Sequence, residues 1–96
     1  KISSVTIIGR RWRDKANGNT YHTATIIVNG EEVGATPRTY GYGNAYEETA
    51  LAWLDANGYV TRARSANGRE SLSRAAQRMK FKLVSEVADV ARKKDL

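Results

Sequence analysis

The chain has no cysteine and only one histidine, one methionine and one proline among its 96 residues. Without cysteine it can form neither a disulfide nor a thiolate metal site. A single histidine, with no paired carboxylates at a ligand spacing, gives no basis for another kind of metal site. No Ser/His/Asp arrangement or phosphate-loop motif is present. The sequence therefore predicts a protein that is not an enzyme and that holds no metal and no cofactor.

Long apolar runs are also missing. No stretch approaches the roughly 20 residues of a membrane-spanning helix, and no signal-peptide pattern opens the chain. We therefore expect no membrane partner and a cytoplasmic location. The length predicts a single domain, with residues 1–60 as its core. Residues 61–96 are expected to add a basic linker and a C-terminal helix, in the same domain or as a dimerising extension.

Positive charge is what the sequence has in excess, and it is concentrated in the last third. The net charge is +6; residues 1–60 carry six basic and six acidic residues, whereas residues 61–96 carry ten and four. Between Arg62 and Lys82, seven basic residues are accompanied only by Glu70. This asymmetry favours a polyanionic partner, with a solvated, solubilising surface as the alternative interpretation.

The first 36 residues predict a three-stranded antiparallel meander. Segments 4–13 and 20–28 are rich in β-branched residues, and Asn17-Gly18 between them is typical of a two-residue type I′ turn. Asn29-Gly30 predicts a second such turn, followed by a short strand at about 31–36. If Asn17 and Gly18 are the central turn residues, Trp12 faces Thr23 on the next strand.

This pairing sorts the side chains of the hairpin onto two faces, because neighbours in a strand point to opposite sides. The predicted core face holds Val5, Ile7, Ala24, Ile26 and Val28. The predicted exposed face holds Thr6, Ile8, Arg10, Trp12, Tyr21, Thr23, Thr25 and Ile27. Arg11, Arg13 and His22 fall at the turn end of the core face, where we expect His22 to be a packing or surface residue.

A helix is predicted after the loop at 37–43, which contains the only proline. Asn44 is a candidate N-cap, and Asn57-Gly58 is typical of a helix end. The apolar stripe of this helix is Tyr46, Ala50, Trp53 and Leu54. Gly41-Tyr42-Gly43 before it is interpreted as a flexible turn rather than as an anion site.

A second, long helix is predicted from Asn67 to about Lys94, because no proline or glycine interrupts residues 69–94. Its stripe is Leu72, Ala76, Met79, Leu83, Val87 and Val90. At ~25 residues it would be ~38 Å long, so it would overhang the domain, break, or form a homodimer. Residues 79–83 also alternate with period two, which leaves a fourth strand as the alternative, but no turn residue marks its ends. The predicted class is α+β: a three-stranded antiparallel meander, a packed helix and a long C-terminal basic helix.

Two groups of residues are candidates for contact with nucleic acid or another partner. The first combines aromatic and basic residues of the hairpin: Arg10, Arg11, Trp12, Arg13, Tyr21 and Thr23. Arginine donates to phosphates and guanine edges, and aromatic rings stack on bases. The alternative is that Trp12 and Tyr21 only pack against each other or beneath the long helix. The second group lies in the basic third: Arg62, Arg64, Arg69, Arg74, Arg78, Phe81 and Lys82. There Phe81 is either a partner anchor or a sign that the helical phase is wrong.

Residues 20–54 resemble DNA-binding domains built from a three-stranded sheet and a helix, namely the arm-binding domain of tyrosine-type integrases and the plant ethylene-response domain. The resemblance implies that the exposed sheet residues Arg10, Trp12, Tyr21, Thr23 and Thr25 face the duplex. The outline is also similar to the β-β-β-α part of double-stranded-RNA-binding domains. That family has lysines at the helix start, where this chain has Asn44, Ala45, Glu47 and Glu48. Separately, the stretches GNTYH, VNGE and YGYG resemble small phage proteins, which implies a host-takeover or anti-defence role.

Two functions follow as hypotheses. The first is a small basic, non-catalytic nucleic-acid-binding protein, with duplex DNA favoured, that contacts the phosphate backbone through the Arg/Trp sheet face and the basic helix. The second is a phage-encoded inhibitor that binds a host defence complex by protein–protein contact in the host cytoplasm.

Overall fold

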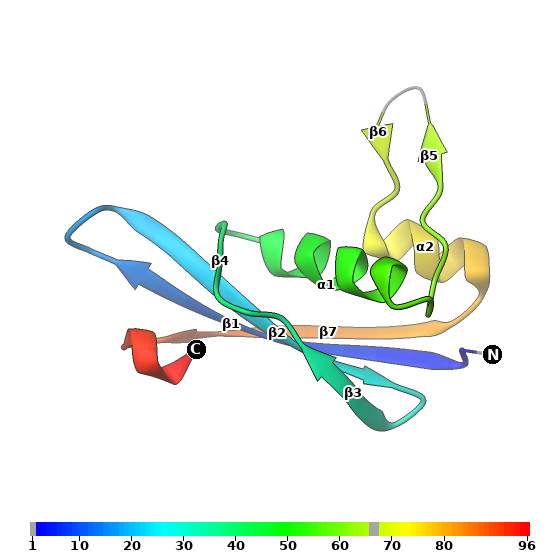
Figure 1. Ribbon diagram of the computed structural model, residues 1–96, viewed down its shortest axis with the longest axis horizontal. Helices are drawn as coiled ribbons and strands as arrows, with labels where there is room; N and C mark the ends of the chain where they lie inside the picture. Colours follow the sequence, from blue (N-terminus) through cyan, green and yellow to red (C-terminus); the bar gives the residue numbers. More distant parts are fainter. Residues whose placement is uncertain (1, 66–67) are drawn as a thin grey trace.

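A mixed five-stranded sheet with two short helices on one face forms a small α+β fold (Figure 1). The computed structural model describes residues 2–65 and 68–96. The elements in chain order are β1 Ser4–Asp14, β2 Asn19–Val28, β3 Glu31–Ala35, β4 Thr39–Tyr40, α1 Ala45–Ala56, β5 Arg64–Ser65, β6 Gly68–Arg69, α2 Leu72–Met79, β7 Lys82–Val90 and the 3-10 helix η1 Lys93–Asp95.

The sheet joins both ends of the chain. Its strand order is β3-β2-β1-β7, and the short β4 pairs with the hairpin end of β2. Strands β1, β2 and β3 are antiparallel, whereas β7 runs parallel to β1. The basic last third therefore supplies an edge strand to the sheet that the first residues begin, while β5 and β6 form a separate two-stranded ribbon.

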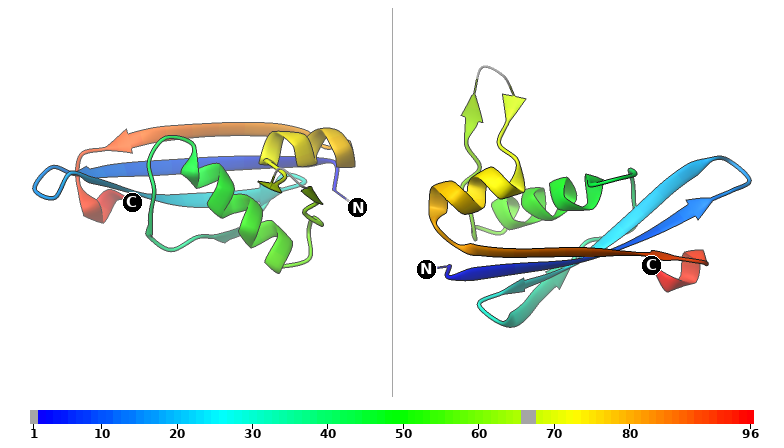
Figure 2. Two further views of the ribbon diagram at one scale, coloured as in Figure 1. Left: turned by 90° about the horizontal axis from the view of Figure 1, so that it is seen from above. Right: turned by 180° about the vertical axis from the view of Figure 1, so that it is seen from behind.

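Helices α1 and α2 lie on the same face of the sheet, and the core is enclosed between them and that face (Figure 2). The β1–β2 hairpin extends past the start of α1, as a two-stranded ribbon (Figure 1). On the opposite side of the sheet, η1 lies against β1 at the hairpin end. The buried apolar residues are Val5, Ile7, Ala24, Ile26, Val28, Tyr46, Ala50, Leu51, Leu54, Val60, Leu72, Ala75, Ala76 and Phe81.

Helix α1 approaches the sheet so closely that two positions need glycine. A Cβ atom on Gly34 would lie 2.2 Å from Cζ2 of Trp53, and one on Gly9 would lie 2.5 Å from Cδ2 of Tyr46. A missing side chain in a strand thus makes room for an aromatic ring of the helix. Trp53 in turn stacks on Tyr59, with ring centroids 5.7 Å apart.

The first hairpin has the predicted faces but not the predicted register. Trp12 pairs with Tyr21 and Arg10 with Thr23, so the pairing is shifted by two residues from the one expected. The reason is the turn: residues 15–18 form a four-residue loop in which the Gly18 N–H donates to the Asp14 carbonyl oxygen at 2.7 Å. The Asp14 carboxylate accepts hydrogen bonds from Ala16 N at 3.1 Å and Asn17 Nδ2 at 2.8 Å. An even shift keeps every side chain on its predicted face.

The second turn and the first helix agree with the sequence. Asn29 and Gly30 have φ of 52° and 84°, as a type I′ turn needs, and Val28 pairs with Glu31. Helix α1 ends where Gly58 adopts φ of 79°. At its start, however, the Asn44 side chain makes no capping hydrogen bond, in contrast to the expected cap.

The prediction of a long C-terminal basic helix is wrong, and with it the predicted fold class. Helix α2 ends at Met79 after 8 residues, and Lys82–Val90 form strand β7. The chain leaves the helix through Lys80, which has a left-handed φ of 60° without being glycine. The Phe81 N–H donates to the Ala76 carbonyl oxygen at 3.1 Å, which closes the last turn. A homodimer through a long helix therefore has no basis in this fold.

Phe81 is not a residue of a polar helix face. It is 6% exposed and belongs to the core cluster at the joint between α2 and β7. Beyond it, Leu83 and Val87 pack against the core, and Val84 and Glu86 point the other way. The spacing of Leu83 and Val87 fits a helix and a strand alike, whereas Val90 fits only the helical stripe and lies on the other face of β7. The free edge of β1 decides for the strand, because pairing satisfies its backbone groups.

Candidate functional site

The face of the sheet turned away from α1 and α2, here called the open face, is the main candidate surface. Alternation along the strands assigns its residues. They are Thr6, Ile8, Arg10 and Trp12 of β1, Tyr21, Thr23, Thr25 and Ile27 of β2, Tyr40 of β4, and Lys82, Val84, Glu86, Ala88 and Val90 of β7. Within the described residues only η1 lies on this side, at one end (Figure 1). The long helix expected as a cover for Trp12 and Tyr21 does not exist, because α2 ends at Met79 and residues 82–90 form β7.

Three aromatic rings form a row across the hairpin end of the open face. Trp12 and Tyr21 are direct partners in the ladder, and their rings stack with centroids 6.0 Å apart at an interplanar angle of 23°. Tyr21 is also the partner of Tyr40, whose ring meets it edge-on at 5.9 Å. Tyr40 is 62% exposed. The row therefore offers both a half-buried platform and a protruding ring.

Two arginines accompany the aromatic row. The guanidinium carbon of Arg38 lies 5.5 Å from the ring centroid of Tyr21, in a cation–π contact. Arg10 is exposed on the open face, one ladder step from the row and opposite Thr23. In the described part of the chain neither arginine forms an ion pair. Both positive charges are thus available to a ligand.

Sequence reasoning found Arg10, Trp12, Tyr21 and Thr23 but missed Tyr40 and Arg38. Both lie in the loop around the only proline, where no periodic pattern shows that two residues join the sheet as β4. The misplaced register also hid the direct pairing of Trp12 with Tyr21.

The basic residues of the last third do not extend the open face. Arg62 is bound to Glu48 of α1 and donates from Nε to the Glu70 carbonyl oxygen at 3.1 Å; its side chain is 7% exposed. Arg78 of α2 binds Glu70 and the carbonyl oxygen of Thr61. These contacts tie the linker to both helices, on the face opposite the aromatic row (Figure 2). The expected continuous surface of sheet and basic helix is therefore not formed.

The other predicted residues of the last third are separated. Arg74 is exposed on α2. Lys82 lies on the open face, but beside Ser4 at the end far from the aromatic row. Phe81 is buried in the core. The side chains of Arg64 and Arg69 lie outside the described part of the structure.

Glu70 links stability to pH. Its hydrogen bonds with Arg78, and then with the Ala63 N–H, lower the pKa of Glu70 from 4.5 to about 2. Because this pKa is lower in the folded chain, the carboxylate stabilises the fold above pH 4.5, and its contribution is lost as the pH falls towards 2. We expect Glu70→Gln to lower the melting temperature at neutral pH, with a difference from the parent protein that vanishes near pH 2. Circular dichroism melts across this range measure it.

The matched control is Glu31→Gln, since Glu31 is exposed and forms no ion pair in the described residues. This control should leave the melting temperature unchanged at every pH. A deficit for Glu70→Gln that is the same at all pH values would contradict the assigned role of the carboxylate.

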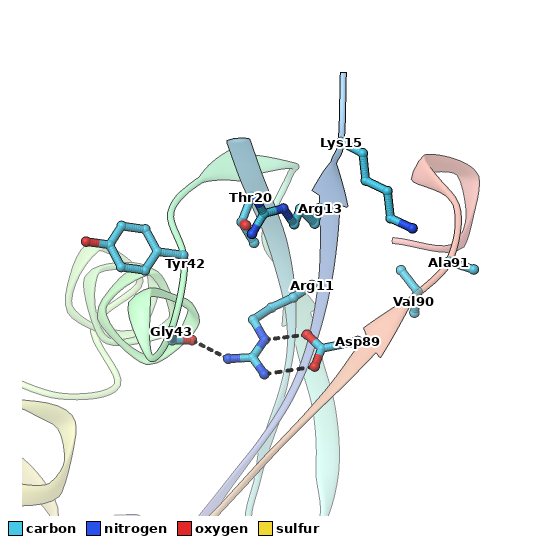
Figure 3. A pocket seen from close by; sticks show the side chains of 9 residues that line it. All are labelled: Arg11, Arg13, Lys15, Thr20, Tyr42, Gly43, Asp89, Val90 and Ala91. Carbon is cyan, nitrogen blue, oxygen red and sulfur yellow. Dashed lines mark hydrogen bonds and ion pairs between the residues drawn. The ribbon is translucent and has the colours of Figure 1, made fainter. Parts of the chain in front are cut away.

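Arg11, Arg13 and His22 lie on the helix side of the hairpin. Arg11 binds Asp89 of β7 through two hydrogen bonds of 2.8 and 3.2 Å and donates to the Gly43 carbonyl oxygen at 2.9 Å (Figure 3). Arg13 is exposed. His22 is 1% exposed, with Nδ1 3.1 Å from the Gly41 carbonyl oxygen and Nε2 2.6 Å from Thr49 Oγ1. Of the two roles expected for His22, a surface or a packing residue, its burial shows the packing role.

The described residues contain no group of three or more His, Cys, Asp or Glu side chains able to hold a metal ion. Among them, no helix combines the length and apolar character that crossing a membrane needs. No protein-family model, curated protein or solved structure matches the chain.

Proposed function

We propose that the protein binds nucleic acid, without catalysis, through the hairpin end of the open face. The observation that carries this proposal is the row of Trp12, Tyr21 and Tyr40, with two arginines beside it that form no ion pair with any described residue. Neither α1 nor α2 lies on this face, and η1 lies there against β1. Aromatic rings stack on bases or sugars, and guanidinium groups bind phosphates and guanine edges. The hairpin end therefore offers aromatic rings for stacking and guanidinium groups for phosphates and guanine edges.

The shape of the hairpin favours duplex DNA. Its end extends past α1 as a two-stranded ribbon, and a ribbon of this kind fits the major groove, which is about 12 Å wide. Arg10 and Thr23 are ladder partners behind this ribbon, where β7 also pairs with β1, and they lie on the sheet face that the ribbon would turn towards the groove. Arginine there can bind guanine, and the threonine methyl group can contact thymine. Arg62 and Arg78 are excluded from this surface, because each is held in an ion pair on the other side.

Salt dependence tests the electrostatic part of the proposal. We expect the affinity for a short fluorescent DNA duplex to fall steeply between about 50 and 200 mM KCl. The double substitution Arg10→Gln/Arg38→Gln should weaken binding, and it should reduce the slope of log K against log salt by about 1 for each of the two arginines that binds phosphate rather than guanine. Fluorescence anisotropy measures both quantities.

The matched control is Arg74→Gln/Lys82→Gln, which removes the same charge from exposed positions away from the aromatic row. It should change the slope much less. Equal weakening by both double variants would mean that only net charge matters, and would contradict a site at the hairpin end.

The other half of the open face favours a second candidate, docking on another protein. Glu86 and Lys82 give this half one charge of each sign. Ile8 and Ile27 lie there with Val84, which is 38% exposed. Contacts of this kind persist as salt rises, because they depend on apolar burial. Salt-tolerant capture of one protein, together with no measurable DNA affinity at low salt, would favour this candidate over the first.

A further inference from the structure

We infer that a cavity on the helix side of the same hairpin is a phosphate-binding site. The cavity has a volume of about 570 Å³, within the usual range for small-ligand sites (Figure 3). Three segments enclose it: the end of the β1–β2 hairpin, the loop before α1, and the end of β7. It faces away from the aromatic row, and the inference does not depend on the proposed function of the open face.

The walls of the cavity are held together by Arg11. This one guanidinium bridges β1 to Asp89 of β7 and to the Gly43 carbonyl oxygen of the loop before α1 (Figure 3). The two hydrogen bonds to Asp89 are parallel, and paired bonds of this kind fix geometry as well as adding energy. Three segments distant in the chain are thereby kept in place around the empty space.

The charge of the cavity calls for an anion. Arg11 and Asp89 neutralise each other, which leaves Arg13 and Lys15 as the remaining ionic groups of the lining. In the described part of the chain neither forms an ion pair. Figure 3 shows Arg13 directed towards Thr20 and Lys15 directed towards Val90 and Ala91, so the two cations lie on opposite sides of the cavity. These two exposed cations, which form no ion pair with any described residue, favour a ligand with about two negative charges that draws both side chains towards it.

Phosphate fits these groups better than a carboxylate does. A phosphate monoester carries about −1.5 to −2 charges near neutral pH and three strong acceptor oxygens. The planar guanidinium of Arg13 can bind two of those oxygens, and Lys15 can act as a point charge on the third. Thr20, the ladder partner of Arg13, adds a hydroxyl donor. The ligand class is therefore a phosphate group, whether free, on a nucleotide or at the end of a nucleic acid.

The test uses the whole isotope-labelled chain and nuclear magnetic resonance titrations at constant ionic strength. We expect inorganic phosphate to shift the signals of Arg13, Lys15 and Thr20 saturably, and to leave those of Trp12 and Tyr40 in place. Adenosine monophosphate, and a short DNA duplex with or without a 5′-phosphate, identify the source. Tighter binding of the nucleotide indicates a nucleotide site, and shifts that require the 5′-phosphate indicate recognition of a nucleic-acid end. Adenosine alone should produce no shift.

Arg13→Gln/Lys15→Gln should lower phosphate affinity at least about tenfold, the effect of losing charge-assisted hydrogen bonds. Both residues are exposed, so this variant is expected to fold, and its circular dichroism spectrum checks that. Arg74→Gln/Lys82→Gln, with the same charge change elsewhere, should bind phosphate as the parent protein does. Unsaturable shifts spread over all basic residues, or undiminished binding by the Arg13/Lys15 variant, would overturn the inference. If the open face fails to bind DNA but phosphate still binds in the cavity, the inference stands.

Discussion

Phe81→Ala is expected to lower the free energy of unfolding by about 3–5 kcal/mol, the usual cost of removing a buried phenylalanine side chain. Phe81 is 6% exposed and fills the joint where α2 gives way to β7. Its loss leaves a cavity between the helix layer and the edge strand. Since small domains have only about 5–15 kcal/mol of stability, this one substitution removes much of it. Urea unfolding followed by circular dichroism measures the change.

The neighbouring Lys82→Ala is the control, because Lys82 is exposed and should change stability by no more than about 0.5 kcal/mol. The comparison also tests the fold. On a continuous helix Phe81 would lie on the polar face, and its removal would cost as little as the removal of Lys82. Equal, small effects at both positions would therefore contradict the strand β7.

Trp12→Ala/Tyr40→Ala is expected to weaken DNA binding by about 30-fold or more, because two stacking rings are lost. Stacking of one base on an aromatic ring contributes about 1–3 kcal/mol, and every 1.4 kcal/mol is a factor of about ten in affinity. Tyr40 is 62% exposed, so its single replacement should reduce affinity with little loss of stability. Trp12 stacks on Tyr21 in the folded protein, so its replacement should also lower the melting temperature. Anisotropy titrations and thermal melts on the single and double variants separate the two effects.

Tyr42→Ala provides a matched aromatic control. Tyr42 is 74% exposed, but it lies near the start of α1, beside the cavity rather than on the open face. Its replacement should leave DNA affinity unchanged. A loss as large as that from Tyr40→Ala would mean that exposed rings in general promote binding, and would contradict a site made by the aromatic row.

Local patterns predicted local structure well in this chain. Alternation along β1 and β2 identified the core face, and Asn29-Gly30 identified a true type I′ turn. The hairpin register was missed because Asp14 caps a four-residue loop, an interaction of one side chain that an Asn-Gly pair does not reveal. The error of two residues left the faces intact but concealed that Trp12 and Tyr21 are partners.

Structure that depends on distant pairing could not be predicted in the same way. Leu83 and Val87 satisfy helical and strand spacing together, and the choice is made by β1, which lies at the other end of the chain. The sequence did not predict that the helix ends at Lys80, because a lysine with positive φ is uncommon. The predicted continuous binding surface of sheet and basic helix was wrong for a related reason. Net charge along the sequence does not show that Arg62 forms an ion pair with Glu48, or Arg78 with Glu70.

The parallel pairing of β1 with β7 also has a consequence for the order in which the chain folds. Ser4 meets Lys82 and Trp12 meets Val90, so this half of the ladder closes only after the chain has been synthesised as far as residue 90. The β1–β2 hairpin and the turn at Asn29-Gly30 can form earlier, because their paired residues are close in sequence. High contact order slows folding, and an unpaired strand edge invites association with other chains. During synthesis the outer edge of β1 is therefore exposed until residues 82–90 follow and pair with it.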